Sequence, residues 1–291
     1  MKSSEIALYI HQELKGNDIE IKGFSSLSNL EEETVVFAKK HKKEYEELLT
    51  KSQNILAIVC EGYENLNIPH ITTDNPRLDF IKVVRHFFTK NDIPVGIHPT
   101  AVVEYSAKID QDVAIGAHCY IGPGVSIASG TVIMPNVSIY GKVTIGHNCY
   151  IKPGAVIGGS GFGFEYDEDG IPLQFPHTGE IIIGDNVYIG ANATIDRATL
   201  DATIIEDNVK IDNLVHIAHN CIVGKNTLMT GCSTISGGVK VGENCWIAPN
   251  STVYQQLKIG ANSRIGMGAV VLRSVKPGVT VFGNPASELD L

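Results

Sequence analysis

An apolar residue recurs at every sixth position over most of this chain, and this period constrains the fold more than any other feature. In the last third of the chain the repeat occupies Ile205, Ile211, Ile217, Val223, Met229, Ile235, Val241, Ile247, Val253, Ile259, Ile265 and Val271. A period of six matches neither an α-helical turn of 3.6 residues nor the two-residue alternation of a single strand. It is typical of a solenoid in which each hexad forms one flat side of a coil. We therefore predict an all-β parallel β-helix, in which three hexads return the chain to a point about 4.8 Å above its start.

The same repeat divides the chain into domains. It begins at Ile97, and it is interrupted by a Gly- and Phe-rich stretch at 158–180 and by a short insertion at 196–199. Residues 1–93 do not follow it and indicate a small α/β domain, in which Asp74-Asn75-Pro76 starts a helix that runs through Phe88. We predict a linker at 91–94, a β-helix over 94–275 and a short C-terminal tail over 276–291.

Composition argues against several classes of function. The chain has 32 acidic and 23 basic residues and a net charge of -9, which disfavours binding to nucleic acid or to an anionic membrane. It contains no apolar run of transmembrane length and no signal-peptide core, so we expect a cytoplasmic protein without membrane insertion. Four of the six cysteines stand two places before a hexad apolar residue: Cys119, Cys149, Cys221 and Cys245. This regularity favours a packing position over disulfides or zinc, and we predict no metal site.

The first candidate for chemistry is His219. Gly237 follows it by 18 residues and should lie directly over it, one coil up. A histidine beneath a backbone N–H on the outside of the solenoid pairs a base with an oxyanion donor. The alternative from the repeat alone is a corner histidine that only makes a surface hydrogen bond.

Three motifs in order make the chain resemble a known family. They are Gly161-Phe162-Gly163-Phe164, Ile189-Gly190-Ala191-Asn192 running into Thr194-Ile195-Asp196-Arg197, and Lys210-Ile211-Asp212-Asn213 running into Ile217-Ala218-His219-Asn220. Together they resemble the UDP-3-O-(3-hydroxyacyl)glucosamine N-acyltransferases of lipid A synthesis, which are left-handed β-helix enzymes with hexapeptide repeats. The resemblance extends to the N-terminal domain. It implies a homotrimer with active sites between the β-helices, an acyl thioester donor, and the amine of a nucleotide-linked amino sugar as acceptor.

The resemblance also implies roles for the residues at the acyl-transfer centre. His219 takes the place of the general base, Asp212 that of the carboxylate that orients it, and Gly237 that of the oxyanion donor. Gln256 occupies the position of the family's second active-site histidine, and we assign Gln256 and His216 to substrate binding, with a structural role as the alternative for His216. A rival mechanism leaves proton loss to the substrate, with His219 only positioning the sugar.

Other residues are predicted to hold the two substrates. Phe37 and Tyr45 resemble the aromatic pair that sandwiches uracil, and Asn75 stands where the family has an Asn-Pro. Because a Gly- and Phe-rich loop in mid-solenoid suits a ligand wall, we also assign Phe162 and Phe164 to substrate binding.

The donor is predicted to be an acyl-CoA, used as a cosubstrate with no permanently bound cofactor. Gly283-Asn284-Pro285-Ala286 resembles the ending of CoA-dependent sugar acetyltransferases, and the family's C-terminal helical extension is not found before Leu291. Two glycines are expected to offer backbone amides to a pantetheine, and three cations to bind phosphate. These residues are Gly266, Gly268, Arg264, Arg273 and Lys276.

The main prediction is therefore an N-acyltransferase that moves an acyl group from acyl-CoA to a nucleotide-linked amino or deoxyamino sugar. The first alternative is the UDP-3-O-(3-hydroxyacyl)glucosamine N-acyltransferase of lipid A synthesis, with acyl-carrier protein as donor. Two alternatives come from other classes: a non-catalytic sugar-nucleotide binding protein, and a β-helix carbonic anhydrase. The last requires two histidines five residues apart in the β-helix, a spacing that this sequence lacks.

Overall fold

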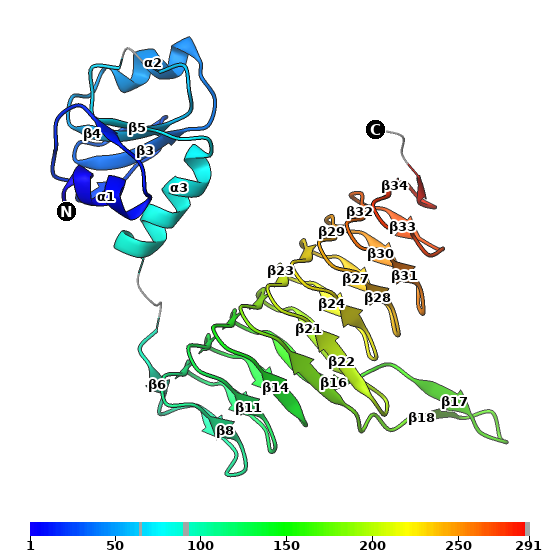
Figure 1. Cartoon of the computed structure of the whole chain (residues 1–291). Coiled ribbons are helices and arrows are strands. Elements are labelled where there is room, and N and C mark those ends of the chain that lie inside the picture. The colour runs from blue at the N-terminus through cyan, green and yellow to red at the C-terminus, as the bar shows by residue number, and fades with distance from the viewer. Residues whose placement is uncertain (64–65, 90–92, 289–291) are drawn as a thin grey trace. The chain divides into compact units, whose positions relative to one another are not determined.

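The computed structural model describes residues 1–63, 66–89 and 93–288, and the chain divides into two compact units, Met1–Asp92 and Ile93–Leu291 (Figure 1). This division lies within one residue of the predicted domain boundary. Residues 91 and 92 of the predicted linker lie outside the described residues.

The N-terminal unit is the predicted α/β domain. Its five-stranded sheet has the order β1-β5-β4-β3-β2, in which only β1 is antiparallel to its neighbour. The strands are β1 (Leu14–Lys15), β2 (Gly23–Phe24), β3 (Thr34–Ala38), β4 (Ile55–Val59) and β5 (His70–Thr72), and the helices are α1 (Ser3–Tyr9), α2 (Lys43–Leu49) and α3 (Pro76–Val83), which continues as a π-helical turn over Val84–Phe88. One apolar cluster packs the sheet against α1 and α3, and a second packs it against α2, so each face is covered. The predicted helix from Pro76 through Phe88 is confirmed.

The second unit is a β-helix of three parallel sheets whose strands alternate along the chain (Figure 1). The first sheet has eleven strands: β6 (Gly96–Ile97), β9 (Ala114–Ile115), β12 (Val132–Ile133), β15 (Tyr150–Ile151), β20 (Tyr188–Ile189), β23 (Lys210–Ile211), β26 (Leu228–Met229), β29 (Trp246–Ile247), β32 (Arg264–Ile265), β34 (Thr280–Phe282) and β35 (Ser287–Glu288). The second has nine: β7 (Val102–Val103), β10 (Tyr120–Ile121), β13 (Ser138–Ile139), β16 (Val156–Ser160), β21 (Thr194–Arg197), β24 (His216–Ile217), β27 (Thr234–Ile235), β30 (Thr252–Val253) and β33 (Val270–Val271). The third has eight: β8 (Lys108–Ile109), β11 (Ser126–Ile127), β14 (Val143–Ile145), β19 (Glu180–Ile183), β22 (Ala202–Ile205), β25 (Ile222–Val223), β28 (Lys240–Val241) and β31 (Lys258–Ile259).

The strand register confirms the 18-residue coil. Ile211 pairs with Met229, Met229 with Ile247, and Ile247 with Ile265, and all four side chains are buried in one continuous core. Ile97 is an exception, because the first coil has no coil below it and this side chain is 50% exposed.

The corners between the flat sides of each coil favour asparagine and glycine. Most of them place an Asn or a Gly in the left-handed backbone region, as at Asn220 (φ 61°) and Gly238 (φ 71°).

The predicted cysteine packing position is confirmed, since all four thiols are free and buried. Each also faces a carbonyl of the neighbouring coil; for Cys221 Sγ this is Ser236 O, at 3.2 Å.

The two interruptions of the repeat fall on neighbouring strands of the second sheet. Residues 158–180 leave β16 and form an antiparallel hairpin of β17 (Phe164–Tyr166) and β18 (Pro172–Gln174), which projects from the stacked coils in Figure 1. The insertion at 196–199 lengthens β21, which pairs with β16 through a bulge. The insertions therefore extend the same side of the β-helix in two adjacent coils.

The predicted C-terminal boundary at residue 275 is too early. β34 pairs with β32 and so continues the first sheet, while β35 folds back antiparallel to β34. Val281 is buried in the core, which is why the segment stays on the coil after the hexad has ended.

Candidate active site

His219 lies at the corner between β24 and β25, and glycines approach its ring from two sides. A methyl group on Gly237, one coil above, would lie 2.8 Å from both Cε1 and Nε2 of His219. A methyl group on Gly161, from the 158–180 loop, would lie 2.7 Å from its Cδ2. The prediction that Gly237 lies directly over His219 is confirmed, and both positions require glycine because the imidazole occupies the space of a side chain.

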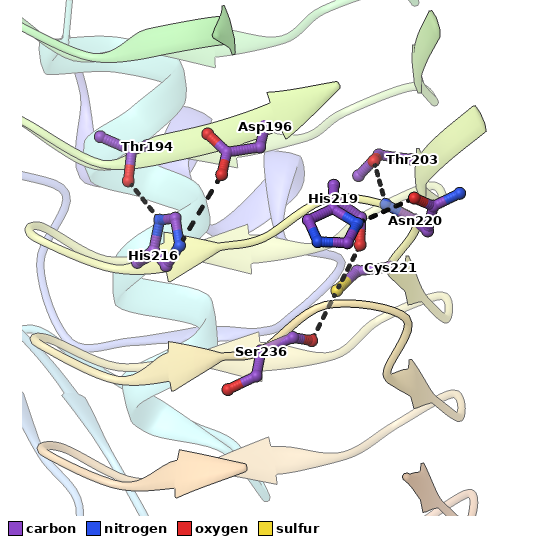
Figure 2. Close-up of polar contacts among 8 residues, drawn as sticks. All are labelled: Thr194, Asp196, Thr203, His216, His219, Asn220, Cys221 and Ser236. Atoms are coloured by element: carbon purple, nitrogen blue, oxygen red, sulfur yellow. Dashed lines mark hydrogen bonds and ion pairs between the residues drawn. The ribbon is translucent and has the colours of Figure 1, made fainter. Parts of the chain in front are cut away.

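The hydrogen bonds of Asn220 define the tautomer of His219. The Asn220 Oδ1 accepts hydrogen bonds from the backbone N–H and the hydroxyl of Thr199, each at 3.1 Å, so this atom is the amide oxygen. It lies 2.9 Å from His219 Nδ1, which must therefore carry the proton (Figure 2). The lone pair is then on Nε2, the nitrogen that faces Gly237, and this is the arrangement that a general base requires.

The backbone N–H of Gly237 is a candidate oxyanion donor. Within the parts of the chain that the structure describes, no hydrogen bond uses this N–H, whereas the Gly237 carbonyl accepts from Gln256 N at 2.9 Å. Gln256 is exposed, and its Cγ lies 3.4 Å from where a methyl on Gly238 would be. Gln256 thus stacks on the same corner as His219, two coils higher.

Within one chain Asp212 does not contact His219, so the predicted orienting role of Asp212 stays a prediction. Its carboxylate accepts hydrogen bonds from Asn213 N at 2.7 Å and from Gly231 N at 3.2 Å. Asp212 lies at the corner between β23 and β24, whereas His219 lies at the next corner, between β24 and β25. The two side chains are therefore at opposite ends of one side of the coil, and the orienting contact within one chain comes from Asn220.

A second pair, Asp196 and His216, lies on the outer face of the second sheet near His219. The Nδ1 of His216 lies 2.7 Å from Thr194 Oγ1, and its Nε2 lies 3.9 Å from Asp196 Oδ2 (Figure 2). Burial raises the pKa of Asp196, while the neighbouring His216, His219 and His177 act in the opposite direction. Asp196 thus brings a carboxylate close to three histidines.

Asn220 and Asp196 were not predicted as site residues. Asn220 belongs to the Ala-His-Asn motif and Asp196 to the insertion that shifts the hexad, so both had a signal in the sequence. Neither role follows from spacing alone, because each depends on a hydrogen bond or charge contact between coils.

Two family models match the β-helix. The model for the bacterial transferase hexapeptide (six repeats) matches residues 124–159, 202–237 and 238–273, and the model for the hexapeptide repeat of succinyl-transferase matches 107–140 and 180–218. The UDP-3-O-acylglucosamine N-acyltransferase of Coxiella burnetii (strain RSA 493 / Nine Mile phase I) is 35% identical over 254 residues, which are 80% of this chain and 74% of the relative. The chain belongs to the UDP-3-O-acylglucosamine N-acyltransferase family.

Further matches agree with this family and with its fold. UDP-3-O-acylglucosamine N-acyltransferase 1 of Legionella pneumophila (strain Paris) is 35% identical over 250 residues, covering 77% of this chain and 69% of the relative. Among solved structures, LpxA from Acinetobacter baumannii matches with a TM-score of 0.61 and 32% identity, covering 66% of this chain and 73% of LpxA. The protein is therefore a left-handed β-helix acyltransferase, which favours an enzyme over a non-catalytic binding protein or a carbonic anhydrase. In the segments that the structure describes, no helix is long and apolar enough to cross a membrane.

In this member of the family, the predicted ligand wall is an exposed apolar surface. Phe162 and Phe164 are 87% and 47% exposed, and their rings lie 4.9 Å apart. With Tyr166 and Pro172 they line a pocket of about 590 Å³ on the projecting hairpin. The structure thus brings the two phenylalanines together, and substrate binding by them stays a prediction.

Phe37 and Tyr45 line one pocket of about 590 Å³ in the N-terminal unit, together with Lys39 and Lys42. Phe37 is half-buried and also packs on Phe80, with a distance of 4.8 Å between the ring centroids. The structure thus brings the two aromatic residues to one pocket, and Phe37 also belongs to the core of the domain, so base binding by them stays a prediction.

Asn75 has a local structural role. Its Oδ1 accepts a hydrogen bond from Leu78 N at 3.2 Å, which caps α3. It also lines a second pocket with Asp74 and Lys39. Lys39 is common to this pocket and to the Phe37–Tyr45 pocket.

The backbone amides expected to bind pantetheine are already engaged. Gly266 N donates to Val281 O at 2.8 Å, and Gly268 N donates to Pro249 O at 2.9 Å. The Gly266 bond exists because the coil continues through Val281, where a tail was expected, whereas Gly268 donates to the preceding coil. Gly266 is also covered by Phe282, whose Cδ2 would lie 2.2 Å from a methyl group there. The predicted cations Arg264, Arg273 and Lys276 are exposed.

Proposed function

We propose that this protein is a UDP-3-O-acylglucosamine N-acyltransferase, which forms an amide between a thioester-borne acyl group and the sugar amine. The observation that carries the proposal is the geometry of His219. Asn220 orients its ring so that the basic Nε2 faces Gly237, where any side chain would clash with the imidazole. The relatives from Coxiella and Legionella are UDP-3-O-acylglucosamine N-acyltransferases, which supports the same acceptor. This likeness favours the lipid A alternative over a CoA-dependent enzyme for deoxysugars.

The chemistry requires one proton to move. The amine nitrogen attacks the thioester carbonyl and must lose a proton, which the Nε2 of His219 accepts. The carbonyl oxygen gains negative charge in the tetrahedral intermediate, and the N–H of Gly237 stabilises it. The carbon–sulfur bond then breaks, and the thiolate takes the proton from the imidazolium, so the enzyme returns to its starting state.

The acceptor's nucleotide is assigned to the pocket of Phe37 and Tyr45. An aromatic side chain stacked on a base contributes about 1–3 kcal/mol per base in single-strand binders. The exposed cations Lys39 and Lys42 at the rim can bind a diphosphate by charge-assisted hydrogen bonds. This supports a uridine diphosphate acceptor.

The donor is assigned as an acyl group on acyl-carrier protein, the alternative implied by the resemblance. The family itself supports this assignment. The backbone amides of Gly266 and Gly268, which were expected to bind the pantetheine of CoA, are engaged in other hydrogen bonds. The exposed Arg264, Arg273 and Lys276 then offer cations to an acidic carrier.

A homotrimer is part of the same proposal. Asp212 and His219 lie at different corners of one coil, so a contact between them requires a second copy of the chain. Light scattering of the purified protein measures this directly, and a monomer would remove the role assigned to Asp212.

The function is tested by mass-spectrometric detection of the N-acylated product from UDP-3-O-acylglucosamine. One acyl group is offered in parallel on acyl-carrier protein and on CoA, with UDP-N-acetylglucosamine as the acceptor control, because it has no free amine. Product from the free-amine acceptor only, and faster from the carrier protein, is expected. Turnover with CoA alone would overturn the donor assignment, and no product from either donor would overturn the function.

A further inference from the structure

The loop over residues 158–180 contributes to the centre a histidine that was not predicted as a site residue. His177 is 6% exposed, and its Nε2 is one of three buried side-chain polar atoms without a hydrogen-bond partner within the described residues. The other two, His70 Nε2 and Ser233 Oγ, belong to the N-terminal sheet and to a corner of the coil. An unpaired buried acceptor is costly, so its presence beside the predicted base calls for a role.

The protonation of His177 follows from its other nitrogen. Nδ1 lies 2.8 Å from the carbonyl oxygen of Phe175, which can only accept a hydrogen bond. Nδ1 therefore carries the proton, and the neutral ring has its lone pair on Nε2. His177 and His219 share this tautomer, although one is set by a carbonyl and the other by the Asn220 amide.

The glycines of the Gly-Phe-Gly motif pack against the ring of His177. A methyl group on Gly161 would lie 2.8 Å from His177 Nε2 and 2.7 Å from His219 Cδ2, and one on Gly163 would lie 3.2 Å from His177 Cε1. The two imidazole rings are 5.1 Å apart between centroids and inclined by 72°, an edge-to-face contact. The motif thus brings the two rings together and excludes water from the Nε2 of His177.

Three other titratable groups lie around His219. Asp196 lies on β21, His216 lies on β24, and His177 belongs to the loop over residues 158–180. Asp196 interacts electrostatically with all three histidines, and its nearest partner is His216 at 3.9 Å. His177 is the one of these groups that touches the His219 ring directly.

We propose that His177 is a positioning residue that holds the ring of His219 and stabilises its protonated form during acyl transfer. A buried lone pair beside a ring that becomes positive is electrostatic preorganisation, because it stabilises the charge that proton transfer creates. This inference rests on the proposed function for the reaction it serves, but its physical content is a property of the free enzyme.

The test is an NMR titration of His219 in the substrate-free, full-length protein labelled at histidine, with His219→Gln used to assign the resonance. His177→Phe keeps a ring of similar size but removes the acceptor, and His177→Gln restores an acceptor oxygen. His147→Phe is the matched control, because His147 is an exposed histidine on the same β-helix. The His219 titration midpoint should fall by about one pH unit in His177→Phe, by less in His177→Gln, and not at all in the control.

Kinetics provides the second readout. In His177→Phe the acid limb of the kcat/KM profile should move to lower pH by the same amount as the NMR midpoint, and kcat should fall about tenfold. An unchanged His219 midpoint in folded His177→Phe would overturn the proposal, as would a His177→Gln variant no closer to wild type than His177→Phe. If no variant or wild-type protein turns over substrate, the proposed function fails, whereas the NMR result still decides the role of His177.

Discussion

Replacing Gly237 with alanine tests the acyl-transfer centre most sharply, because the geometry predicts both the damage and its limits. The added methyl group would lie 2.8 Å from Cε1 and Nε2 of His219. Non-bonded heavy atoms prefer a separation of about 3.5–4.0 Å, so the ring must move by roughly 1 Å. A displacement of about 1 Å in a catalytic group lowers the rate by about 10²-fold.

Stability should be almost unaffected by this substitution. Gly237 does not have the left-handed backbone that other corner glycines have, and it is only half-buried. We therefore expect Gly237→Ala to change the free energy of unfolding by less than about 1 kcal/mol. Gly231→Ala is the matched control, since it is also a corner glycine and its new methyl would lie 3.4 Å from the nearest atom, Asp212 Oδ2.

The assay is steady-state formation of the N-acylated product, with circular dichroism melting of both variants. Gly237→Ala should lose about 10²-fold in kcat with a melting temperature close to wild type, while Gly231→Ala should keep its activity. Wild-type turnover by a folded Gly237→Ala variant would show that the reaction does not take place between this corner and His219.

Four further predictions concern single side chains. His219→Ala should lower kcat by roughly 10²–10⁴-fold in a folded protein, and near-normal turnover at neutral pH would instead indicate substrate-assisted proton loss. Asn220→Asp keeps an acceptor for His219 Nδ1 but adds a charge that favours the imidazolium, so the acid limb of the pH–rate profile should move up by about one unit; an unchanged limb would separate Asn220 from the base. Burial raises the folded pKa of Asp196 above its unfolded value of 3.8, so its ionisation costs stability as the pH rises above that range. Urea titrations should therefore show Asp196→Asn more stable than wild type at pH 8, with a smaller difference near pH 3, and equal differences at both would contradict the assignment. Phe37→Ala and Tyr45→Ala should each raise the acceptor KM by roughly 5- to 100-fold and leave the donor KM unchanged, whereas a rise in the donor KM would reverse the two binding sites.

Local sequence features were sufficient to predict the β-helix and its register. Because strands of successive coils stack in register, an 18-residue spacing becomes a contact, and this spacing alone predicts that Gly237 lies over His219. The hexad core, the cysteine packing position and the helix capped by Asn75 follow from the same kind of short-range pattern. Each depends on one periodic or local rule that the neighbouring residues do not override.

Contacts that cross between coils or come from the insertions were decided only by the tertiary structure. Asp212 and His219 are close in sequence but lie at different corners, because a flat side separates them, so within one chain the orienting contact comes from Asn220. His177 reaches His219 from the 158–180 loop, whose path no hexad dictates. The expected open amide of Gly266 is engaged because a further strand pairs above it after the repeat has ended, and that of Gly268 is engaged by Pro249 O of the preceding coil. The repeat determines where the backbone lies, whereas side chains that meet across coils depend on which hydrogen bonds the folded chain can satisfy.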